Sequence, residues 1–516
     1  MSGAGALSLA ACNVMPLPRI CISAFSGGGG KTLLALGLSR AFAAQGIIVQ
    51  PFKKGPDYID AAWLSCAAGR PARNLDPFVL PHKRLRALFL HVMAQLQAHA
   101  PNEILALVEG NRGLYDGMDT MGTCSTAELA RTLDCPVILS VDCTKMTRTT
   151  AALVHGVTSF EPGLRFAGAV LNRIGSSRHE TSLRRVFEAY TDIPVLGALP
   201  RLVKNPLPER HMGIASSGSE LSPQAQETMD TLGSLVALHL DLDTVLGAAR
   251  AAPPLGKDVE TVWTAPGHTS LCTASTPKPR IGYVRDAALW FYYEDNLEAL
   301  ERAGAQLVCL SLVGGQSARP AASENEAQHM DVDALYLGGG FPEDWTEALS
   351  ASPFVRSLAA WADAGMPIYA ECGGFMLLTQ GIERDGKLWP MGNIFPVIAQ
   401  FCQRPQGLGY VSGTVSGKNP YFPQGLSLKG HEFHYSRCLW KNSPPPFALR
   451  LHKGRGMGTL SPADGKDGTD SVDGLVYRNV WASYTHIFAP AVSCWAPNFV
   501  AAARQFAVTR REMAQG

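Results

Sequence analysis

The sequence predicts an α/β protein made of two domains, each with a largely parallel sheet. Short apolar runs alternate with helical patterns in both halves of the 516-residue chain, which is typical of parallel strands joined by right-handed crossovers. A glycine-rich loop at 26–32 follows the first apolar run, and a turn centred on Cys372 follows a later one. A chain of this length also exceeds what one hydrophobic core usually supports.

The first domain is expected over residues 18–250, after a disordered leader at 1–17. A helix is expected at 31–45, where alanine and leucine recur at helical spacing. Residues 221–250 are expected to be mostly helical and to close this domain. The expected strands are 19–24, 47–52, 104–109, 136–142, 166–172 and 194–198.

The second domain is expected over residues 280–505. Residues 251–279 are rich in proline, alanine, threonine and glycine, and they form the expected linker. Gly454–Gly474 is rich in glycine and aspartate and is expected to be a surface loop. The expected elements are strands at 280–284, 306–310, 334–337 and 366–370, and a helix at 293–303.

Charge and composition argue against several classes of protein. Lysine and arginine number 45, against 44 aspartate and glutamate residues, so we expect no basic surface that would attract nucleic acid. No apolar run approaches the roughly 20 residues that a membrane span requires. The 12 cysteines show no paired CxxC spacing, which is typical of reduced thiols in a cytoplasmic protein.

The segment Ser26-Gly27-Gly28-Gly29-Gly30-Lys31-Thr32 predicts a phosphate-binding loop for ATP. Between a strand and a helix, its backbone N–H groups turn inward, and Lys31 and the helix N-terminus add positive charge. The Thr32 hydroxyl stands where Mg²⁺ is held against the β- and γ-phosphates. Phe25 occupies the position where the strict pattern has glycine. The alternative interpretation is a glycine-rich turn with a solvated lysine.

Carboxylates at two strand ends are candidates for the same magnesium site. Asp57 and Asp60 follow the second strand, and Glu109 ends the third. Open parallel sheets bind ligands at the carboxyl ends of their strands, and Mg²⁺ prefers oxygen ligands. The predicted metal ligands are therefore Thr32, Asp57 and Glu109. Each acid on its own has the simpler interpretation of a turn or helix-capping residue.

Cys372 has the sequence setting of a nucleophile. It follows a buried strand and precedes Gly373 and a helical run, and small residues permit the tight elbow that exposes a sulfur atom. The dipole of the new helix is expected to lower the Cys372 pKa. His486 is the expected base. Gly339, Gly340 and Gly373 are expected to bind the oxyanion of glutamine, while the alternative for a lone cysteine is buried filler.

Two further histidines, His431 and His434, compete with His486 for the role of base. Their spacing also suits a pair of metal ligands, although no third ligand appears in the pattern. The sequence does not decide between these roles.

Together the two candidate sites indicate one class of reaction. The phosphate loop implies ATP, and a thiol nucleophile with a histidine base suits the release of ammonia from glutamine. The sequence therefore predicts an ATP-driven amidation with glutamine as the nitrogen donor.

A series of motifs extends over most of the chain, from about Pro18 to Phe499. In the N-terminal half they are Pro51–Asp60, Arg73–Pro77, Glu109–Gly110, Gly113–Gly117 and Leu207–His211. In the C-terminal half they are Tyr336–Glu343, Ala370–Gly374, Gly430–Ser436 and Ala482–His486. In this order they resemble the cobyrinate a,c-diamide synthase family, and they are more specific for the family than for its substrate.

The resemblance implies a dethiobiotin-synthetase-like P-loop domain followed by a class I glutamine amidotransferase domain. In such an enzyme, ATP and Mg²⁺ phosphorylate a carboxylate of a tetrapyrrole-derived macrocycle. Ammonia released from L-glutamine at Cys372 then displaces the phosphate, and the a and c acetate groups of cobyrinate become amides for cobalamin biosynthesis. The resemblance also suggests that Tyr58, Asp60, Arg112 and Tyr115 lie near the macrocycle. The resemblance does not decide whether the protein forms a homodimer.

The sequence departs from corrin-pathway members of the family at two places. Asn111-Arg112 stands where they usually have an apolar pair, and Ala24 and Phe25 replace the usual loop residues. Because Asn111-Arg112 could touch a substrate carboxylate, sirohaem or nickel-sirohydrochlorin is the alternative macrocycle. As in the family, the glutamate that follows the histidine of triad amidotransferases is absent, since Phe488 stands there. We therefore expect a Cys372–His486 dyad.

A hypothesis from another class is a P-loop switch protein whose second domain is a degenerate amidotransferase-like binding module. Such a module would be expected to lose Cys372 or His486. Both residues are present, which favours the enzyme.

Overall fold

The structure, a computed structural model, describes residues 17–202, 223–255, 261–263, 277–313, 331–460 and 470–515. The described residues form two compact units, the first up to Val262 and the second from Trp263 onward. The leader up to residue 16, much of the predicted linker and the motif Leu207–His211 lie outside the described residues.

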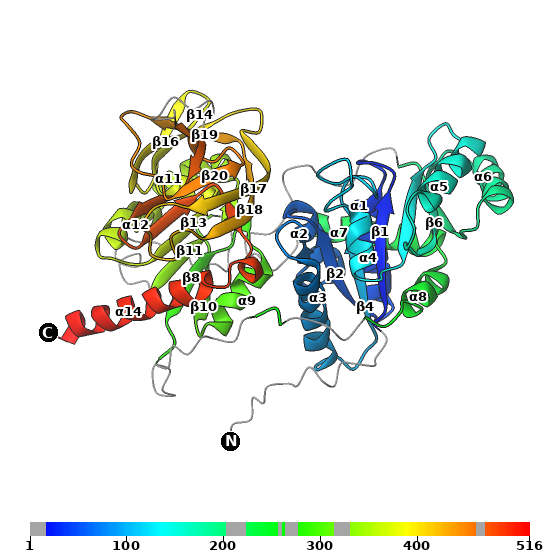
Figure 1. Cartoon of the computed structure of the whole chain (residues 1–516), viewed down its shortest axis with the longest axis horizontal. Helices are drawn as coiled ribbons and strands as arrows, with labels where there is room; N and C mark the ends of the chain where they lie inside the picture. Colours follow the sequence, from blue (N-terminus) through cyan, green and yellow to red (C-terminus); the bar gives the residue numbers. More distant parts are fainter. Residues whose placement is uncertain are drawn as a thin grey trace, which may run out of the picture. The chain divides into compact units, whose positions relative to one another are not determined.

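A seven-stranded parallel sheet forms the centre of the first unit, with the order β3-β2-β4-β1-β5-β6-β7. Every residue of β1 and β4 is buried, as expected for parallel strands whose two faces are covered by helices (Figure 1). The strands are β1 (Arg19–Ala24), β2 (Ile48–Lys54), β3 (Arg73–Leu75), β4 (Ile104–Glu109), β5 (Val137–Asp142), β6 (Phe166–Ile174) and β7 (Val195–Pro200).

Helices connect the strands of this sheet. The sequence prediction missed the short strand β3, and the segment expected to be mostly helical at its end forms two helices. Asp241 lies between them and caps the second, because its side chain accepts a hydrogen bond from the Thr244 N–H at 3.0 Å. The helices are α1 (Lys31–Ala44), α2 (Ile59–Ala68), α3 (His82–Gln97), α4 (Thr126–Thr132), α5 (Arg148–Phe160), α6 (Ser177–Tyr190), α7 (Pro223–His239) and α8 (Leu242–Arg250).

The second unit has a six-stranded main sheet with the order β10-β8-β11-β13-β24-β23. Its pairs are parallel except β23–β24 at one edge. The predicted parallel α/β architecture is therefore confirmed for both units. The strands are β8 (Arg280–Val284), β10 (Gln306–Leu310), β11 (Ala334–Leu337), β13 (Ile368–Glu371), β23 (Leu475–Tyr477) and β24 (Val480–Ser483).

Helices and short turns pack around this main sheet (Figure 1). The helix α13 begins directly after Cys372, and α14 contacts α9. The elements are α9 (Glu294–Arg302), α11 (Thr346–Ala351), α12 (Pro353–Asp363), α13 (Gly373–Leu377) and α14 (Trp495–Gln515), with 3-10 turns η2 (Pro342–Trp345) and η3 (Ala489–Ala491).

Three further sheets were not predicted from the sequence. One pairs β9 (Leu289–Phe291) with β12 (Gly339–Gly340). A four-stranded sheet holds β14 (Thr379–Arg384), β15 (Lys387–Pro390), β16 (Phe395–Phe401) and β19 (Ser436–Trp440). A six-stranded sheet holds β17 (Gly407–Val415), β18 (Ser427–His434), β20 (Leu449–Lys453), β21 (Gly458–Leu460), β22 (Asp470–Asp473) and β25 (His486–Ile487).

The expectation of a plain surface loop at Gly454–Gly474 is wrong for its described ends. There the chain forms β21 and β22, which pair with each other, and β22 also pairs with β20. Glycine and aspartate indicate turns locally, but cross-strand hydrogen bonds from distant residues override that preference.

Helix α1 packs closely against α7 at Gly37. A Cβ atom at Gly37 would lie 2.3 Å from Cγ2 of Val236 and 2.9 Å from the carbonyl oxygen of Leu232. The absence of a side chain therefore sets how near α7 can approach the helix that carries the phosphate loop.

We expect Gly37→Ala to lower the stability of the first unit by about 1–3 kcal/mol, because the new methyl group overpacks this contact. The matched control is Gly247→Ala in α8, where a Cβ meets nothing within 4 Å. That change should raise stability by roughly 0.5–1 kcal/mol through helix propensity. The melting temperatures of both variants are compared with that of the wild-type protein by thermal unfolding. Equal changes in melting temperature would contradict the packing argument.

Candidate active sites

The phosphate loop lies between β1 and α1, as predicted. Gly28 and Gly30 have φ angles of +73° and +87°, which favour glycine. A Cβ at Gly30 would lie 1.9 Å from Nδ2 of Asn172, whereas Cβ atoms at Gly27 and Gly28 would meet nothing within 4 Å. The loop is thus held closely by β6 on one side and is open around Gly27 and Gly28.

Lys31 is buried under this loop. Its ammonium group donates a hydrogen bond to the Ser26 carbonyl at 2.9 Å, which closes the loop around the side chain. Burial and the nearby Lys53 lower the Lys31 pKa. A cavity of about 240 Å³ lies beside the loop, lined by Phe25, Ser26, Gly29, Ser140, Asp142, Thr144 and Met146.

Lys53 forms the centre of a buried charge cluster at the adjacent strand ends. Its ammonium nitrogen lies 2.6 Å from Oδ2 of Asp60 and 3.1 Å from Oε1 of Glu109. Burial alone would lower the Lys53 pKa, but Glu109 and Asp60 raise it above its ordinary value. Lys53 is therefore a permanent cation next to the phosphate loop.

Thr32 and Glu109 meet beside this cation. The Thr32 hydroxyl donates a hydrogen bond to Oε1 of Glu109 at 2.6 Å. The other oxygen of Glu109 is buried and has no hydrogen-bond partner among the described residues. Burial raises the pKa of Glu109, against the opposing effect of Lys53. A buried carboxylate oxygen that has no hydrogen-bond partner is a suitable ligand for a divalent cation.

Asp57, the third predicted metal ligand, is one turn from Asp60. Its Oδ1 accepts a hydrogen bond from the Asp60 N–H at 2.9 Å. Burial and the Asp60 charge raise the Asp57 pKa. Among the described residues, no three histidine, cysteine or acidic side chains form a metal cluster by themselves. Mg²⁺ usually takes one or two carboxylates and completes its shell with phosphate and water, so Glu109 and Asp57 remain its candidate protein ligands.

The four predicted macrocycle contacts lie in different settings. Tyr58 is buried at the start of α2, and Asp60 is in the ion pair with Lys53. Arg112 is exposed on the loop after β4 with a left-handed φ of 52°. The Tyr115 hydroxyl donates a hydrogen bond to the Val157 carbonyl at 2.6 Å. Tyr115 is therefore anchored to α5 by its own hydroxyl.

Cys372 lies on the sharp turn between β13 and α13. Its φ of 50° and ψ of −105° are rare for a residue with a side chain. Its N–H donates to the Ser483 carbonyl at 2.7 Å, and its thiol donates to the Phe433 carbonyl at 3.3 Å. This is the strained elbow that the sequence predicts for a nucleophile.

The predicted oxyanion glycines surround the sulfur atom. The backbone N–H groups of Gly340 and Gly373 interact with Cys372 and favour its thiolate. A Cβ at Gly373 would lie 2.9 Å from the Gly340 nitrogen, and one at Gly339 would lie 2.5 Å from Cε1 of His486. The structure thus brings both glycine segments, the cysteine and the histidine together.

The charge state of this site differs from the sequence expectation. Burial raises the Cys372 pKa, with a further contribution from Glu343, so the expected lowering by the helix dipole is wrong. Burial and the nearby His434 lower the His486 pKa to about 3. Because desolvation penalises both charged forms, the resting pair is a neutral thiol and a neutral imidazole.

Comparison with known proteins identifies a domain family for each unit. A model of the CobQ/CobB/MinD/ParA nucleotide binding domain matches residues 20–214, and one of the CobB/CobQ-like glutamine amidotransferase domain matches residues 280–492. The chain is 38% identical over 487 residues to the cobyrinate a,c-diamide synthase of Magnetococcus marinus, which covers 93% of this chain and 96% of that protein. The synthase of the same name from Syntrophotalea carbinolica is 38% identical, over 84% of this chain and 88% of that protein.

The chain belongs to the cobyrinate a,c-diamide synthase family. A similar protein of Dehalococcoides mccartyi is 35% identical over 95% of this chain and 99% of its own length. The family resemblance derived from the motifs is therefore confirmed over both units.

Glu371, the residue before Cys372, was not predicted as a site residue from the sequence of this family member. Oε2 of Glu371 lies 3.6 Å from Nδ1 of His486, and both side chains are fully buried. Burial raises the Glu371 pKa to about 7. An acidic residue inside an apolar strand was the available signal, because buried carboxylates require partners.

The competing histidines have other contacts. His431 stacks on His486 with ring centroids 4.8 Å apart, and its Nδ1 lies 3.1 Å from the Tyr293 hydroxyl. His434 stacks on Tyr484 with ring centroids 3.7 Å apart. In the part of the chain that the structure describes, no third ligand joins them in a metal site.

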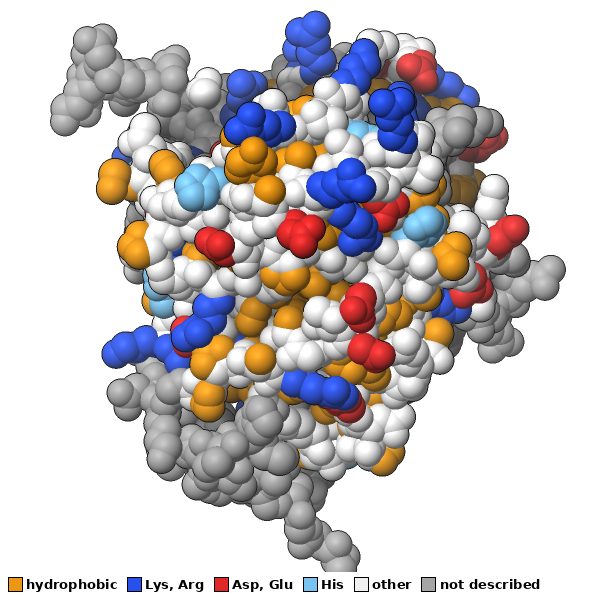
Figure 2. Space-filling view, turned by 90° about the vertical axis from the view of Figure 1, so that its right-hand side faces the viewer, with side chains coloured by type: hydrophobic (Ala, Val, Ile, Leu, Met, Phe, Trp, Pro, Cys, Tyr) orange, Lys and Arg blue, Asp and Glu red, His pale blue; other side chains and the backbone are white. Residues whose placement is uncertain are grey.

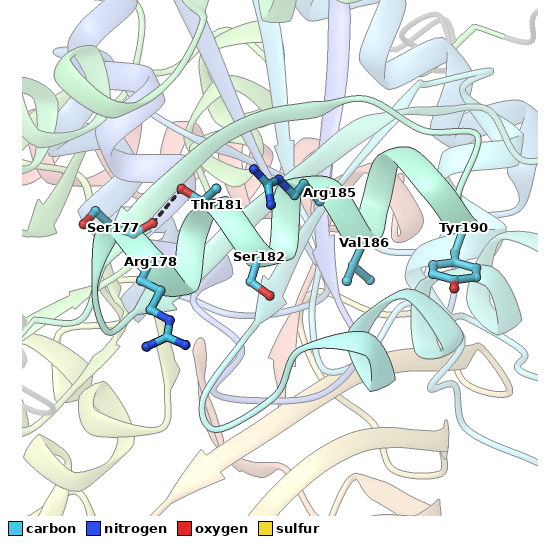
Figure 3. A pocket seen from close by; sticks show the side chains of 7 residues that line it. All are labelled: Ser177, Arg178, Thr181, Ser182, Arg185, Val186 and Tyr190. Atoms are coloured by element: carbon cyan, nitrogen blue, oxygen red, sulfur yellow. Dashed lines mark hydrogen bonds between the residues drawn. The ribbon is translucent and has the colours of Figure 1, made fainter.

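A second depression lies on the surface of the first unit, and its lining shares no residue with either candidate site. It runs along α6 from Ser177 to Tyr190, and its lining comes from this one helix (Figure 3). On the face shown in Figure 2, acidic and basic side chains are interspersed with hydrophobic ones. No described helix has both the length and the apolar character needed to cross a membrane.

The neutral resting state predicts slow alkylation of Cys372. A raised thiol pKa leaves less thiolate at any given pH, so iodoacetamide should modify Cys372 more slowly than the exposed Cys309. The rate should still be rising with pH at about pH 8–9. Peptide mass spectrometry of the intact protein after timed alkylation measures both sites. A Cys372 rate that is already constant below about pH 6 would show a stable thiolate and contradict this prediction.

Proposed function

We propose that this protein is an ATP- and glutamine-dependent ligase that converts the a and c acetate groups of cobyrinate into amides. The observation that carries the proposal is the presence, in one member of this family, of both sites that the reaction needs. Thr32 and Glu109 meet beside the phosphate loop, and Cys372 meets two backbone N–H donors near His486.

The first unit is proposed to activate the substrate carboxylate. A carboxylate is a poor electrophile, and transfer of the γ-phosphoryl group of ATP turns it into an acyl phosphate with a good leaving group. The loop N–H groups and Lys31 would bind the ATP phosphates. Mg²⁺, when held by Thr32 and Glu109 with Asp57 nearby, would neutralise charge on the β- and γ-phosphates.

The second unit is proposed to release ammonia from L-glutamine. His486 takes the Cys372 thiol proton as the sulfur attacks the carboxamide carbon, and the Gly340 and Gly373 N–H groups bind the oxyanion. His486 then gives the proton to the departing ammonia, and water hydrolyses the thioester to glutamate. The ammonia attacks the acyl phosphate, and phosphate leaves as the amide forms.

The macrocycle is proposed to bind near the carboxyl ends of β2 and β4. Arg112 is an exposed cation on the loop after β4, so it would pair with a peripheral carboxylate of the substrate. Tyr58 and Asp60 are proposed to shape the same wall, and Tyr115 to support it from α5. We further propose that the enzyme acts in the cytoplasm, and that a homodimer is compatible with this activity.

Turnover with amide-¹⁵N glutamine tests the substrate. Purified protein with ATP and Mg²⁺ should place two labelled nitrogens in cobyrinate, which mass spectrometry of the product detects. Sirohaem is offered in a parallel reaction as the control macrocycle and should remain unlabelled. Labelled sirohaem with unlabelled cobyrinate would overturn the assignment and move the enzyme to another tetrapyrrole pathway.

We expect Cys372→Ser to abolish glutamine-dependent amidation and to leave ammonia-dependent amidation within about twofold of wild type, since only ammonia release needs the sulfur. Cys309→Ser, which changes an exposed thiol, is the matched control and should keep both activities. The measurement is product formation with glutamine and with ammonium chloride. An equal loss with both nitrogen sources would refute the proposed division of labour.

A further inference from the structure

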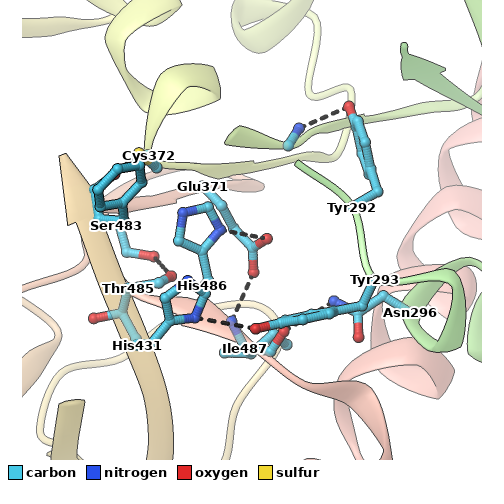
Figure 4. Close-up of polar contacts among 12 residues, drawn as sticks. Tyr292, Tyr293, Asn296, Glu371, Cys372, His431, Ser483, Thr485, His486 and Ile487 are labelled. Atoms are coloured by element: carbon cyan, nitrogen blue, oxygen red, sulfur yellow. Dashed lines mark hydrogen bonds and ion pairs between the residues drawn. The ribbon is translucent and has the colours of Figure 1, made fainter. Parts of the chain in front are cut away.

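Glu371 is fully buried, and its carboxyl group faces the His486 ring (Figure 4). It is the last residue of β13, directly before Cys372. Its Oε2 faces Nδ1 of His486 at 3.6 Å, slightly longer than a hydrogen bond. Such contacts are often long in the free enzyme and shorten when substrate binds.

Three donors hold this carboxyl group in place. The Tyr336 hydroxyl donates to Oε2 at 3.0 Å, and the Tyr369 hydroxyl donates to Oε1 at 3.2 Å. The Ile487 N–H, on the same short strand as His486, donates to Oε1 at 3.0 Å. The strand of the histidine and the strand of the cysteine are therefore joined through this one side chain.

A histidine base needs an acceptor at one ring nitrogen. When a carboxylate accepts from Nδ1–H, Nε2 is left unprotonated to take the proton of the nucleophile, and the carboxylate stabilises the imidazolium that results. Phe488 is apolar and packs edge-on against Tyr293, with ring centroids 5.0 Å apart. The position two residues after His486 therefore supplies no such acceptor.

We propose that Glu371 is the positioning carboxylate of the glutaminase site, so that Cys372, His486 and Glu371 form a triad whose acid comes from the cysteine strand. Glu371 accepts the Nδ1–H of His486 and directs Nε2 toward the sulfur. This proposal rests on the proposed glutaminase function and replaces the expected dyad with a triad.

The rate of glutamate release by the Glu371→Gln variant tests the positioning role of Glu371. It is measured at about pH 8, because this pH lies above the pKa of the wild-type carboxyl group. The amide keeps the shape but loses the charge, so kcat should fall about 10²–10⁴-fold, with KM for glutamine within about threefold. Ammonia-dependent amidation should stay within about twofold. Tyr369→Phe is the matched control, because it removes one hydrogen bond and keeps the carboxylate, and it should stay within about threefold.

A double-mutant cycle separates positioning from mere structural support. If Glu371 acts through the imidazole, Glu371→Gln should cost less than about twofold more in a His486→Ala background. A full additional loss of kcat in that background would overturn the proposal, as would unchanged kcat in a folded Glu371→Gln protein.

If the Glu371→Gln variant does not fold, Glu371→Asp is the second variant, because it keeps the negative charge on a shorter side chain. It should fold with a lowered melting temperature, because the shorter side chain leaves a buried gap, and kcat should fall about 10–100-fold. Unchanged kcat would again overturn the proposal.

The wild-type enzyme supplies the outcome that distinguishes the two proposals. Glutamate release does not depend on which macrocycle is the substrate. If wild type releases no glutamate under any condition, the proposed function itself fails. If wild type releases it and the Glu371 variants match it, only the triad is refuted.

Discussion

The second unit depends on backbone contacts that are closer than any side chain would allow. A Cβ at Gly374 would lie 2.1 Å from the Leu337 carbonyl oxygen, and one at Gly340 would lie 2.1 Å from that of Ala288. The Gly374 N–H donates to the Gly338 carbonyl at 2.8 Å, so the first turn of α13 is bonded directly to the glycine loop. Because neither segment carries side chains there, two N–H donors reach the sulfur atom.

In the first unit the corresponding constraint is electrostatic. Lys53 is buried between Asp60 and Glu109, and each partner would be costly to bury alone. The cluster therefore fixes the ends of β2 and β4 and the start of α2 relative to one another. It also leaves one oxygen of Glu109 without a partner among the described residues. The strand ends beside the phosphate loop are therefore fixed, and this oxygen is available there to bind a cation.

The sequence predicts the buried parallel strands well and the distant pairings poorly. Arg19–Ala24 and Ile104–Glu109 form strands at the predicted positions, because strands covered on both faces read as continuous apolar runs. In the sheet that contains β14, pairs such as Phe401–Ser436 join residues far apart in the chain, which leaves no local period to detect. The hairpin of β14 and β15 at Asp385-Gly386 is local, and its turn signal was missed. In the same way, the Glu371–His486 contact joins β13 and β25, which belong to different sheets and lie far apart in the chain. The direction of the Cys372 pKa shift was mispredicted because burial, which the motif does not encode, outweighs the helix dipole.

The burial of Cys372 has a consequence for the lifetime of the protein. Peroxide oxidises thiolates to sulfenic and then sulfinic acids, and the last of these steps is generally irreversible. A sulfur that stays protonated, with almost none of its surface exposed to solvent, reacts slowly along this route. The resting enzyme therefore keeps its nucleophile in a form that peroxide oxidises slowly.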